Sequence, residues 1–152
     1  MTYTIRHTQR KDCATLSKHT RAADVQEIFA SSGKNPFQVL LRAYFASPDY
    51  CYTVLLEDKI VGMFGISKIT DGVGSPWLLG SNLLLKAPLS FHRKSKKYLD
   101  TFMKDFKVLF NYVDKRNVVA IKWLKGLGFT FTKLVDNFGY QQKPFYEFVK
   151  VR

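Results

Sequence analysis

The segment from Asn117 to Phe129 constrains the fold of this chain more than any other stretch. Its apolar residues recur at the spacing of one helix face: Ala120, Trp123, Leu124 and Leu127. Asn117 is a residue type that caps helix starts, and Gly128 is a type that ends helices in the left-handed conformation. An apolar run begins at Phe129, directly after this glycine. The segment therefore predicts a helix that glycine stops and a strand follows at once.

In the second half of the chain, the spacing of the apolar residues alternates between the period of strands and the period of helices. Residues 77–85 are apolar on both faces, which predicts a strand near the middle of a sheet. From about Ser90 the apolar residues follow helical spacing, as Tyr98, Phe102 and Phe106 do, and predict a helix of roughly 17 residues. Three further strands are expected over Val108–Val113, Phe129–Val135 and Phe145–Val151. Such alternation predicts an α/β sheet that is partly parallel.

The first half of the chain adds shorter elements. Thr2–Arg6 alternates like a strand, Asp12 is expected to cap a helix, and Asp24 to cap a short turn. Asn35 and Pro36 suit a helix start, and the positions after them predict one buried face: Phe37, Leu40, Leu41, Tyr44 and Phe45. Two β-rich runs around a polar turn predict a hairpin: Tyr52–Leu56 and Ile60–Ile69. We therefore expect a single α/β domain over residues 1–152, with about seven strands in a mixed central sheet and about four helices.

Composition excludes several classes of protein. With 152 residues, of which 46% are hydrophobic, the chain can bury a core without disulfides or metals. Its two cysteines, Cys13 and Cys51, form neither a disulfide framework nor a paired metal motif. The start of the chain has no apolar signal core, and no apolar run is long enough to span a bilayer. The sequence thus predicts a cytoplasmic protein with no metal and no membrane span.

The net charge of +12 is distributed unevenly. Residues 1–85 carry 9 Lys and Arg against 7 Asp and Glu, whereas residues 86–152 carry 15 against 5. This asymmetry suggests an anionic partner for the second half. A nucleic acid, a phosphorylated cofactor and an acidic protein surface all fit, and so does a basic surface that serves solubility alone.

The order of elements and the Asn117–Phe129 segment resemble the GCN5-related N-acetyltransferase (GNAT) fold. That family often has Asn, then Ala three residues later, then a helix that closes in Leu-Gly-Phe, as Asn117, Ala120 and Leu127–Phe129 do here. The resemblance implies an N-acetyltransferase that binds acetyl-CoA between two splayed strands and has an amine acceptor. It implies cofactor contacts at seven residues: Leu83, Leu84, Leu85, Arg93, Lys94, Lys96 and Asn117.

The chain departs from the family at the turn that holds the cofactor's pyrophosphate. In the family this turn is rich in glycine, whose small size lets backbone N–H groups reach the phosphates. The matching stretch, Lys86–Lys97, has no glycine, and Lys94 and Lys96 stand where glycines are expected. Either Arg93 and the neighbouring lysines replace the lost amide contacts by charge, or the helix start is simply basic and solvated. Cations at a helix N-terminus are unfavourable without an anion, which keeps the phosphate interpretation open.

The catalytic groups of the family are also missing from their usual places. Leu124 stands where a tyrosine commonly acts as general acid. The predicted strand over residues 77–85 has no carboxylate to act as base, and its only polar side chains are Ser81 and Asn82. Three residues elsewhere are weak candidates for acid or base: His92, Tyr112 and Tyr140.

These departures leave three functions open. The first is an acetyl-CoA-dependent N-acetyltransferase with a degenerate phosphate turn. The second is a non-catalytic protein that keeps the fold for virion structure, assembly or host-protein binding, because Leu83–Phe129 also resembles acetyltransferase-like internal virion or morphogenesis proteins of short-tailed bacteriophages. The third is nucleic-acid binding through the basic second half, which the absence of any nucleic-acid motif disfavours.

Overall fold

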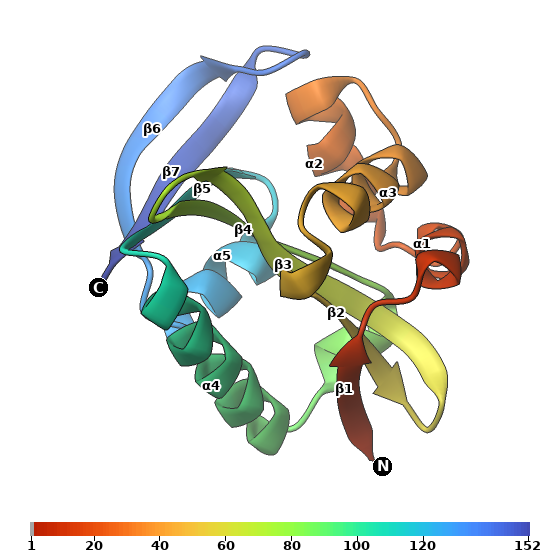
Figure 1. The fold of residues 1–152 in the computed structure, drawn as a ribbon. Coiled ribbons are helices and arrows are strands. Elements are labelled where there is room, and N and C mark those ends of the chain that lie inside the picture. The colour runs from red at the N-terminus through yellow and green to blue at the C-terminus, as the bar shows by residue number, and fades with distance from the viewer. Residues whose placement is uncertain (1) are drawn as a thin grey trace.

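The computed structural model describes residues 2–152, which form one seven-stranded sheet and five α-helices (Figure 1). The strands are β1 (Tyr3–His7), β2 (Cys51–Leu56), β3 (Lys59–Thr70), β4 (Val73–Gly80), β5 (Val108–Asp114), β6 (Thr130–Phe138) and β7 (Lys143–Val151). The α-helices are α1 (Arg10–Ser17), α2 (Ala22–Ser32), α3 (Pro36–Ala46), α4 (Leu89–Asp105) and α5 (Val118–Gly126), and two short 3-10 helices are η1 (Pro48–Tyr50) and η2 (Asn82–Lys86).

The sheet is mixed, in the order β1-β2-β3-β4-β5-β7-β6. All neighbouring strands run antiparallel except β4 and β5, which run parallel. The parallel pair is connected through η2 and α4, because a crossover between parallel strands needs a dozen or more residues. The predicted central strand is indeed the middle one of the seven.

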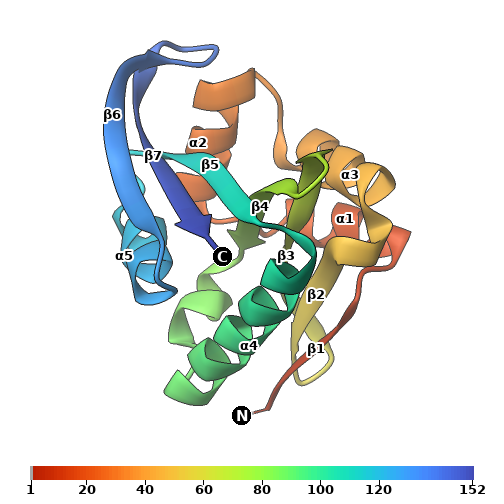
Figure 2. The ribbon, with the colours of Figure 1, turned by 60° about the vertical axis from the view of Figure 1, so that its left-hand side comes forward.

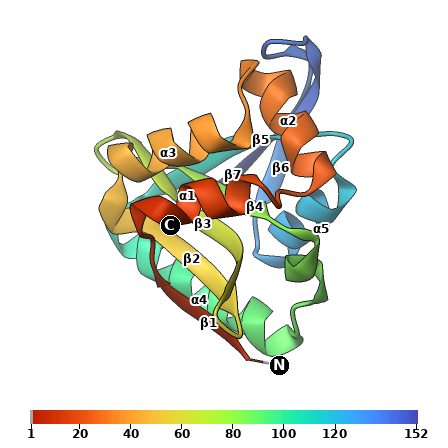
Figure 3. The ribbon, with the colours of Figure 1, turned by 90° about the vertical axis from the view of Figure 1, so that its right-hand side faces the viewer.

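Helices cover both faces of the sheet, with α1 and α3 on one face and α4 on the other (Figure 3). On the α4 face, Phe64 of β3 stacks on Tyr52 and packs edge-on against Tyr98 and Phe102 of α4, with ring centroids 5.5 to 6.3 Å apart. Aromatic pairs of this geometry contribute about 0.5–1.5 kcal/mol beyond the area they bury. On the opposite face, Leu16 and Leu40 pack on Met63, and all three side chains are almost fully buried.

Three sequence predictions need correction. The central strand ends at Gly80 and not at residue 85, because the chain turns into η2 there. Asp12 is the third residue of α1 and forms a capping box with Gln9. Asp24 lies in the first turn of α2, a full helix where a short turn was expected, which raises the number of helices from about four to five.

The start of α3 is as predicted, but its buried face is narrower. The Asn35 side chain accepts a hydrogen bond from the Gln38 amide at 2.9 Å, and Pro36 takes the first helical position. Of the five apolar residues expected on the buried face only Leu40 is buried, whereas Phe37 and Phe45 are exposed. The predicted hairpin is confirmed as β2 and β3, and Gly128 adopts the predicted left-handed conformation with φ +92°.

Candidate active site

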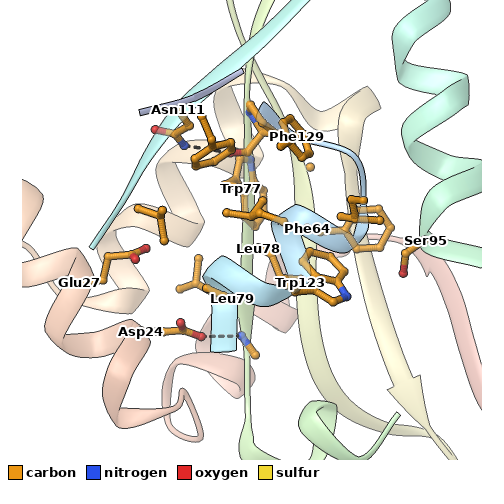
Figure 4. A pocket seen from close by; sticks show the side chains of 18 of the residues that line it. Asp24, Glu27, Phe64, Trp77, Leu78, Leu79, Ser95, Asn111, Trp123 and Phe129 are labelled. Carbon is orange, nitrogen blue, oxygen red and sulfur yellow. Dashed lines mark hydrogen bonds between the residues drawn. The ribbon is translucent and has the colours of Figure 1, made fainter. Parts of the chain in front are cut away.

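The parallel strands β4 and β5 separate soon after they begin. They pair only at Val73–Gly74 and Val108–Leu109, and beyond these residues they diverge. The Asn111 side chain of β5 bridges the start of the gap by donating a hydrogen bond of 2.8 Å to the carbonyl of Pro76 (Figure 4). The sheet is therefore open between the later halves of its two central strands.

The gap exposes the backbone of Leu78. In β4 the N–H and C=O groups of Gly80 point away from β3, since they bond Asp24 and Arg21. Because hydrogen-bonded and non-bonded pairs alternate along antiparallel strands, the backbone groups of Leu78 point the same way. No partner for them is found within residues 2–152. One N–H donor and one C=O acceptor thus face the gap at the centre of the sheet.

A cavity of about 790 Å³ occupies the gap and reaches both sides of the sheet. On the side of α2 and α3 its wall includes Glu27, Ser31 and Ala43. On the side of α4 and α5 its wall includes His92, Lys96 and Lys122. A ligand could therefore approach the centre of the sheet from either face.

Two carboxylates of α2 and the amide of Asn117 close the wide end of the gap. Asp24 accepts a hydrogen bond from the Gly80 amide at 3.2 Å, and Glu27 accepts one from the Asp114 amide at 2.9 Å, so one helix holds the ends of both strands. The Asn117 Nδ2 atom donates to both carboxylates, at 3.0 and 3.2 Å. Figure 4 shows Asp24 and Glu27 extending from α2 toward β4. Arg21 also lines the cavity and forms a salt bridge of 3.0 Å with Asp24, so Asp24 is neutralised by its partner. Glu27 forms no salt bridge within residues 2–152 and is the carboxylate that can carry a net charge on the α2 side.

Glu27 has the protonation properties of a general base. Its pKa is raised to about 7, mainly by burial. The hydrogen bonds from the Asp114 amide and from Asn117 lower the pKa, whereas the nearby carboxylates of Asp24 and Asp114 raise it. Only Oε1 is hydrogen-bonded, and within residues 2–152 no donor reaches Oε2. The side chain is half-buried because it faces the cavity. A carboxylate that titrates near pH 7 beside an open cavity can take a proton from an amine.

The α4 side of the cavity is positively charged. Lys96 and Lys122 line it, and within the described residues neither forms a salt bridge. The amide N–H groups of Leu89 and Ser90, at the start of α4, have no acceptor within residues 2–152. Basic side chains and free helix N-terminal amides both favour an anion at this end.

The structure places the predicted site residues in different surroundings. Leu83, Leu84 and Leu85 lie in η2 beyond the central strand, and Leu84 and Leu85 line the cavity. Arg93 and Lys94 are exposed and do not line it, in contrast to Lys96. The expected family contacts are therefore only partly brought together.

Asn117 was expected to cap α5, but its side chain makes no capping hydrogen bond. It is buried to 2% exposure and turned toward the α2 carboxylates instead. The carboxylates themselves, Asp24 and Glu27, were missed by the sequence reasoning. A signal was present in their spacing of three residues beside Ile28, which puts acidic and apolar side chains on one helix face.

The three acid or base candidates are also separated. His92 lines the α4 side, where its Nδ1 atom accepts a hydrogen bond of 3.0 Å from the indole of Trp123. Tyr112 lines the cavity, but its hydroxyl donates to Glu147 at 2.9 Å, and this bond raises its pKa. Tyr140 lies at the tip of the β6–β7 hairpin, is 67% exposed and does not line the cavity.

Within residues 2–152 no group of three or more His, Cys, Asp and Glu side chains could hold a metal ion. In the same residues no helix has both the length and the apolar character that a membrane crossing needs.

Comparison with known proteins identifies the fold. No protein-family model matches the chain, and no curated protein sequence is significantly similar to it. Among solved structures, a GNAT-family acetyltransferase from Streptococcus pneumoniae is 15% identical, with 99% of this chain and 100% of that chain covered and a TM-score of 0.65. The putative acetyltransferase yncA from Salmonella typhimurium, solved with its cofactor acetyl-CoA, is 14% identical with a TM-score of 0.68, and 98% of this chain and 93% of that chain are covered.

A spermidine N-acetyltransferase from Vibrio cholerae, solved with CoA and spermine, is 12% identical with a TM-score of 0.71, and 98% of this chain and 95% of that chain are covered. At sequence identities this low, the similarity shows a shared fold and does not show shared chemistry. The splayed pair β4–β5, the seven-stranded mixed sheet and near-complete coverage agree in one conclusion: the chain has the fold of the GNAT acetyltransferases.

Proposed function

We propose that this protein is an N-acetyltransferase that moves an acetyl group from a pantetheine thioester, such as acetyl-CoA, to an amine. One observation carries the proposal: the cavity through the sheet has the carboxylate of Glu27 on one side and Lys96 and Lys122 on the other, with the free backbone groups of Leu78 between them. A basic side suits the phosphates of the donor. The ionised carboxylate of Glu27 suits a protonated amine acceptor.

The residues present fit a pantetheine donor. The free N–H of Leu78 can donate to the thioester carbonyl, and its C=O can accept from an amide of the pantetheine. Lys96, Lys122 and the free amides at the start of α4 would hold phosphate. Of the family contacts expected from sequence, we retain Leu84, Leu85 and Lys96. Acetyl-CoA would supply an acetyl group already activated as a thioester.

Glu27 would act on the acceptor. Above its pKa of about 7 the carboxylate can take a proton from the ammonium form of the amine. The neutral nitrogen then attacks the thioester carbonyl carbon and forms a C–N bond. The C–S bond breaks, the sulfur leaves as a thiolate, and the second proton of the attacking nitrogen passes to this thiolate, so that the products are an amide and a free thiol. A thiol ionises with a pKa of about 8.5, so this leaving group needs little help from an acid. Leucine at position 124 is compatible with the reaction for that reason.

Two features favour the second candidate, a non-catalytic protein that uses the fold for virion assembly or for binding a host protein. The start of α4 has no glycine, and the bond between Trp123 and His92 links α5 to α4 at the wall of the cavity. A protein of this kind would bind neither acetyl-CoA nor CoA.

Calorimetry with acetyl-CoA separates the two candidates. We expect binding that weakens at least tenfold in the Lys96→Ala plus Lys122→Ala variant. The variant Lys11→Ala plus Lys34→Ala loses the same charge from exposed positions outside this cavity and should bind like the wild type. Absence of binding at millimolar acetyl-CoA would eliminate CoA as the donor. Binding that is equal in both variants would contradict the assignment of the basic side.

A further inference from the structure

The basic residues at the start of α4 exceed what a ligand inside the cavity can contact. Arg93, Lys94 and Lys97 are exposed and do not line the cavity. No Asp or Glu occurs from residue 86 to residue 99, and within the described residues none of these three side chains forms a salt bridge. Their charge is directed at solvent, where only a larger anionic partner could reach all three.

Four apolar side chains are exposed beside this basic surface: Leu85, Leu89, Val118 and Val119. Their exposed fractions are 49%, 65%, 55% and 44%, in that order. All but Val118 also line the cavity, so they form an apolar rim at its α4 side. Figures 2 and 3 show that the connection from β4 to α4, which contains η2, lies on the same side of the molecule as α5. A rim of apolar side chains next to a basic helix is the composition of a protein-binding surface.

The start of α4 is poorly shaped for the diphosphate of CoA. The side chains of Leu89 and His92 line the cavity at the first turn, and Trp123 holds His92 there, where small residues would let a diphosphate approach the backbone. A single phosphodiester needs fewer such contacts than a diphosphate and a ribose phosphate together. The cavity, in contrast, is open to a thin chain that reaches Leu78.

From these three observations we propose that the acyl donor is a phosphopantetheine thioester carried by an acidic protein. The carrier would dock its acidic surface on Arg93, Lys94 and Lys97 and its apolar residues on the rim. Its pantetheine arm would then enter the cavity between α4 and α5, and Lys96 or Lys122 would contact the phosphodiester. The reaction is the thioester-to-amine transfer described above, so this proposal rests on the proposed function and specifies its donor.

Binding to an acidic acyl carrier protein loaded with acetyl-phosphopantetheine tests the docking surface. We expect the loaded carrier to bind at least tenfold more tightly than acetyl-CoA at low salt, and to lose most of this advantage at high salt. The Arg93→Glu plus Lys97→Glu variant should bind the carrier at least tenfold more weakly. The control Lys11→Glu plus Lys34→Glu makes the same charge change on exposed positions near α1 and α3 and should stay within twofold of the wild type.

Turnover with three donors separates this proposal from the function on which it rests. The donors are the loaded carrier, acetyl-CoA and acetyl-pantetheine, which has neither phosphate nor protein. If acetyl-CoA and acetyl-pantetheine are consumed and the carrier is not, the carrier proposal is wrong and the proposed function stands. If the charge reversal weakens binding to a nucleic acid and leaves the carrier unaffected, the basic surface belongs to a nucleic acid and the proposal is overturned. If no donor is consumed, the proposed function fails as well.

Discussion

Replacing Glu27 by Gln should make the protein more stable at pH 8 and less stable, or unchanged, at pH 5. The side chain keeps its shape, and its amide oxygen can still accept the hydrogen bonds from the Asp114 amide and from Asn117. What disappears is the ionisation of a carboxyl group whose pKa rises on folding from 4.5 to about 7. A rise of that size corresponds to at most about 3 kcal/mol, at about 1.4 kcal/mol per pKa unit.

The sign follows from proton binding. Between pH 4.5 and about 7 the folded protein holds a proton on Glu27 that the unfolded chain has lost, so the free energy of unfolding falls as the pH rises through this window. Above pH 7 both states are ionised, and the full destabilisation is present. Glu27 lines an open cavity that water can enter, which reduces the cost of its ionisation, so we expect a measured difference of about 1–3 kcal/mol.

Urea unfolding of the wild type and Glu27→Gln at pH 5, 6, 7 and 8 measures this difference, with linear extrapolation at each pH. Glu57→Gln is the control, because Glu57 lies exposed in the β2–β3 turn and should give curves parallel to the wild type. If the free energies of unfolding of the wild type and of Glu27→Gln also differ by the same amount at every pH from 5 to 8, Glu27 does not titrate near pH 7 and cannot be the base that we propose. The same variant should lower the rate of amine acetylation by about 10²- to 10⁴-fold.

Three further substitutions test the packing of the fold. Asn117→Ala removes the amide shared by the two α2 carboxylates and should destabilise the protein by about 1–3 kcal/mol in urea unfolding, whereas Asn137→Ala, at an exposed position of β6, should have little effect. Equal effects of the two would contradict the bridging role. Gly139→Ala should destabilise by about 1–3 kcal/mol, because Gly139 has φ +71° and an added Cβ would lie 2.6 Å from the Ser31 carbonyl oxygen. Gly126→Ala should instead stabilise the protein by about 0.5–1 kcal/mol, because an added Cβ would meet no heavy atom within 4 Å apart from its chain neighbours and the backbone of its own helix. A loss of stability in this variant would show that α5 is more tightly packed than described.

Local patterns were sufficient for most of the fold. The hairpin β2–β3, the long helix α4 and the glycine stop after α5 follow from residue periodicity and from single turn residues, which act over a few positions. The end of β4 was missed because Leu83–Leu85 continues the apolar run of the strand, although these residues turn into a 3-10 helix. Gly80, Ser81 and Asn82 are turn-forming residue types and marked this end of the strand, but the apolar residues after them outweighed that signal.

The candidate site was harder to predict because it is built from contacts between distant residues. Asn117 and Glu27 are 90 positions apart, and their hydrogen bond arises only when α2 packs against the end of β5. The pKa of Glu27 is likewise a property of burial in the assembled molecule. The family pattern directed attention to β4 and α5 for acid and base groups, whereas the carboxylates came from α2. The basic charge of the second half was visible in the sequence, but which lysines line the cavity was not.

Transfer of acetyl groups to amines at pH 8, measured for the wild type and Glu27→Gln, tests the central claim most directly. The assay would offer acetyl-CoA, acetyl-pantetheine and acetylated carrier protein as donors, and a panel of primary amines as acceptors. We predict amine-dependent release of free thiol by the wild type, with a rate that rises through pH 7, and a loss of about 10²-fold or more in the variant. A wild-type protein that neither consumes nor binds any of these thioesters at millimolar concentration would contradict the claim.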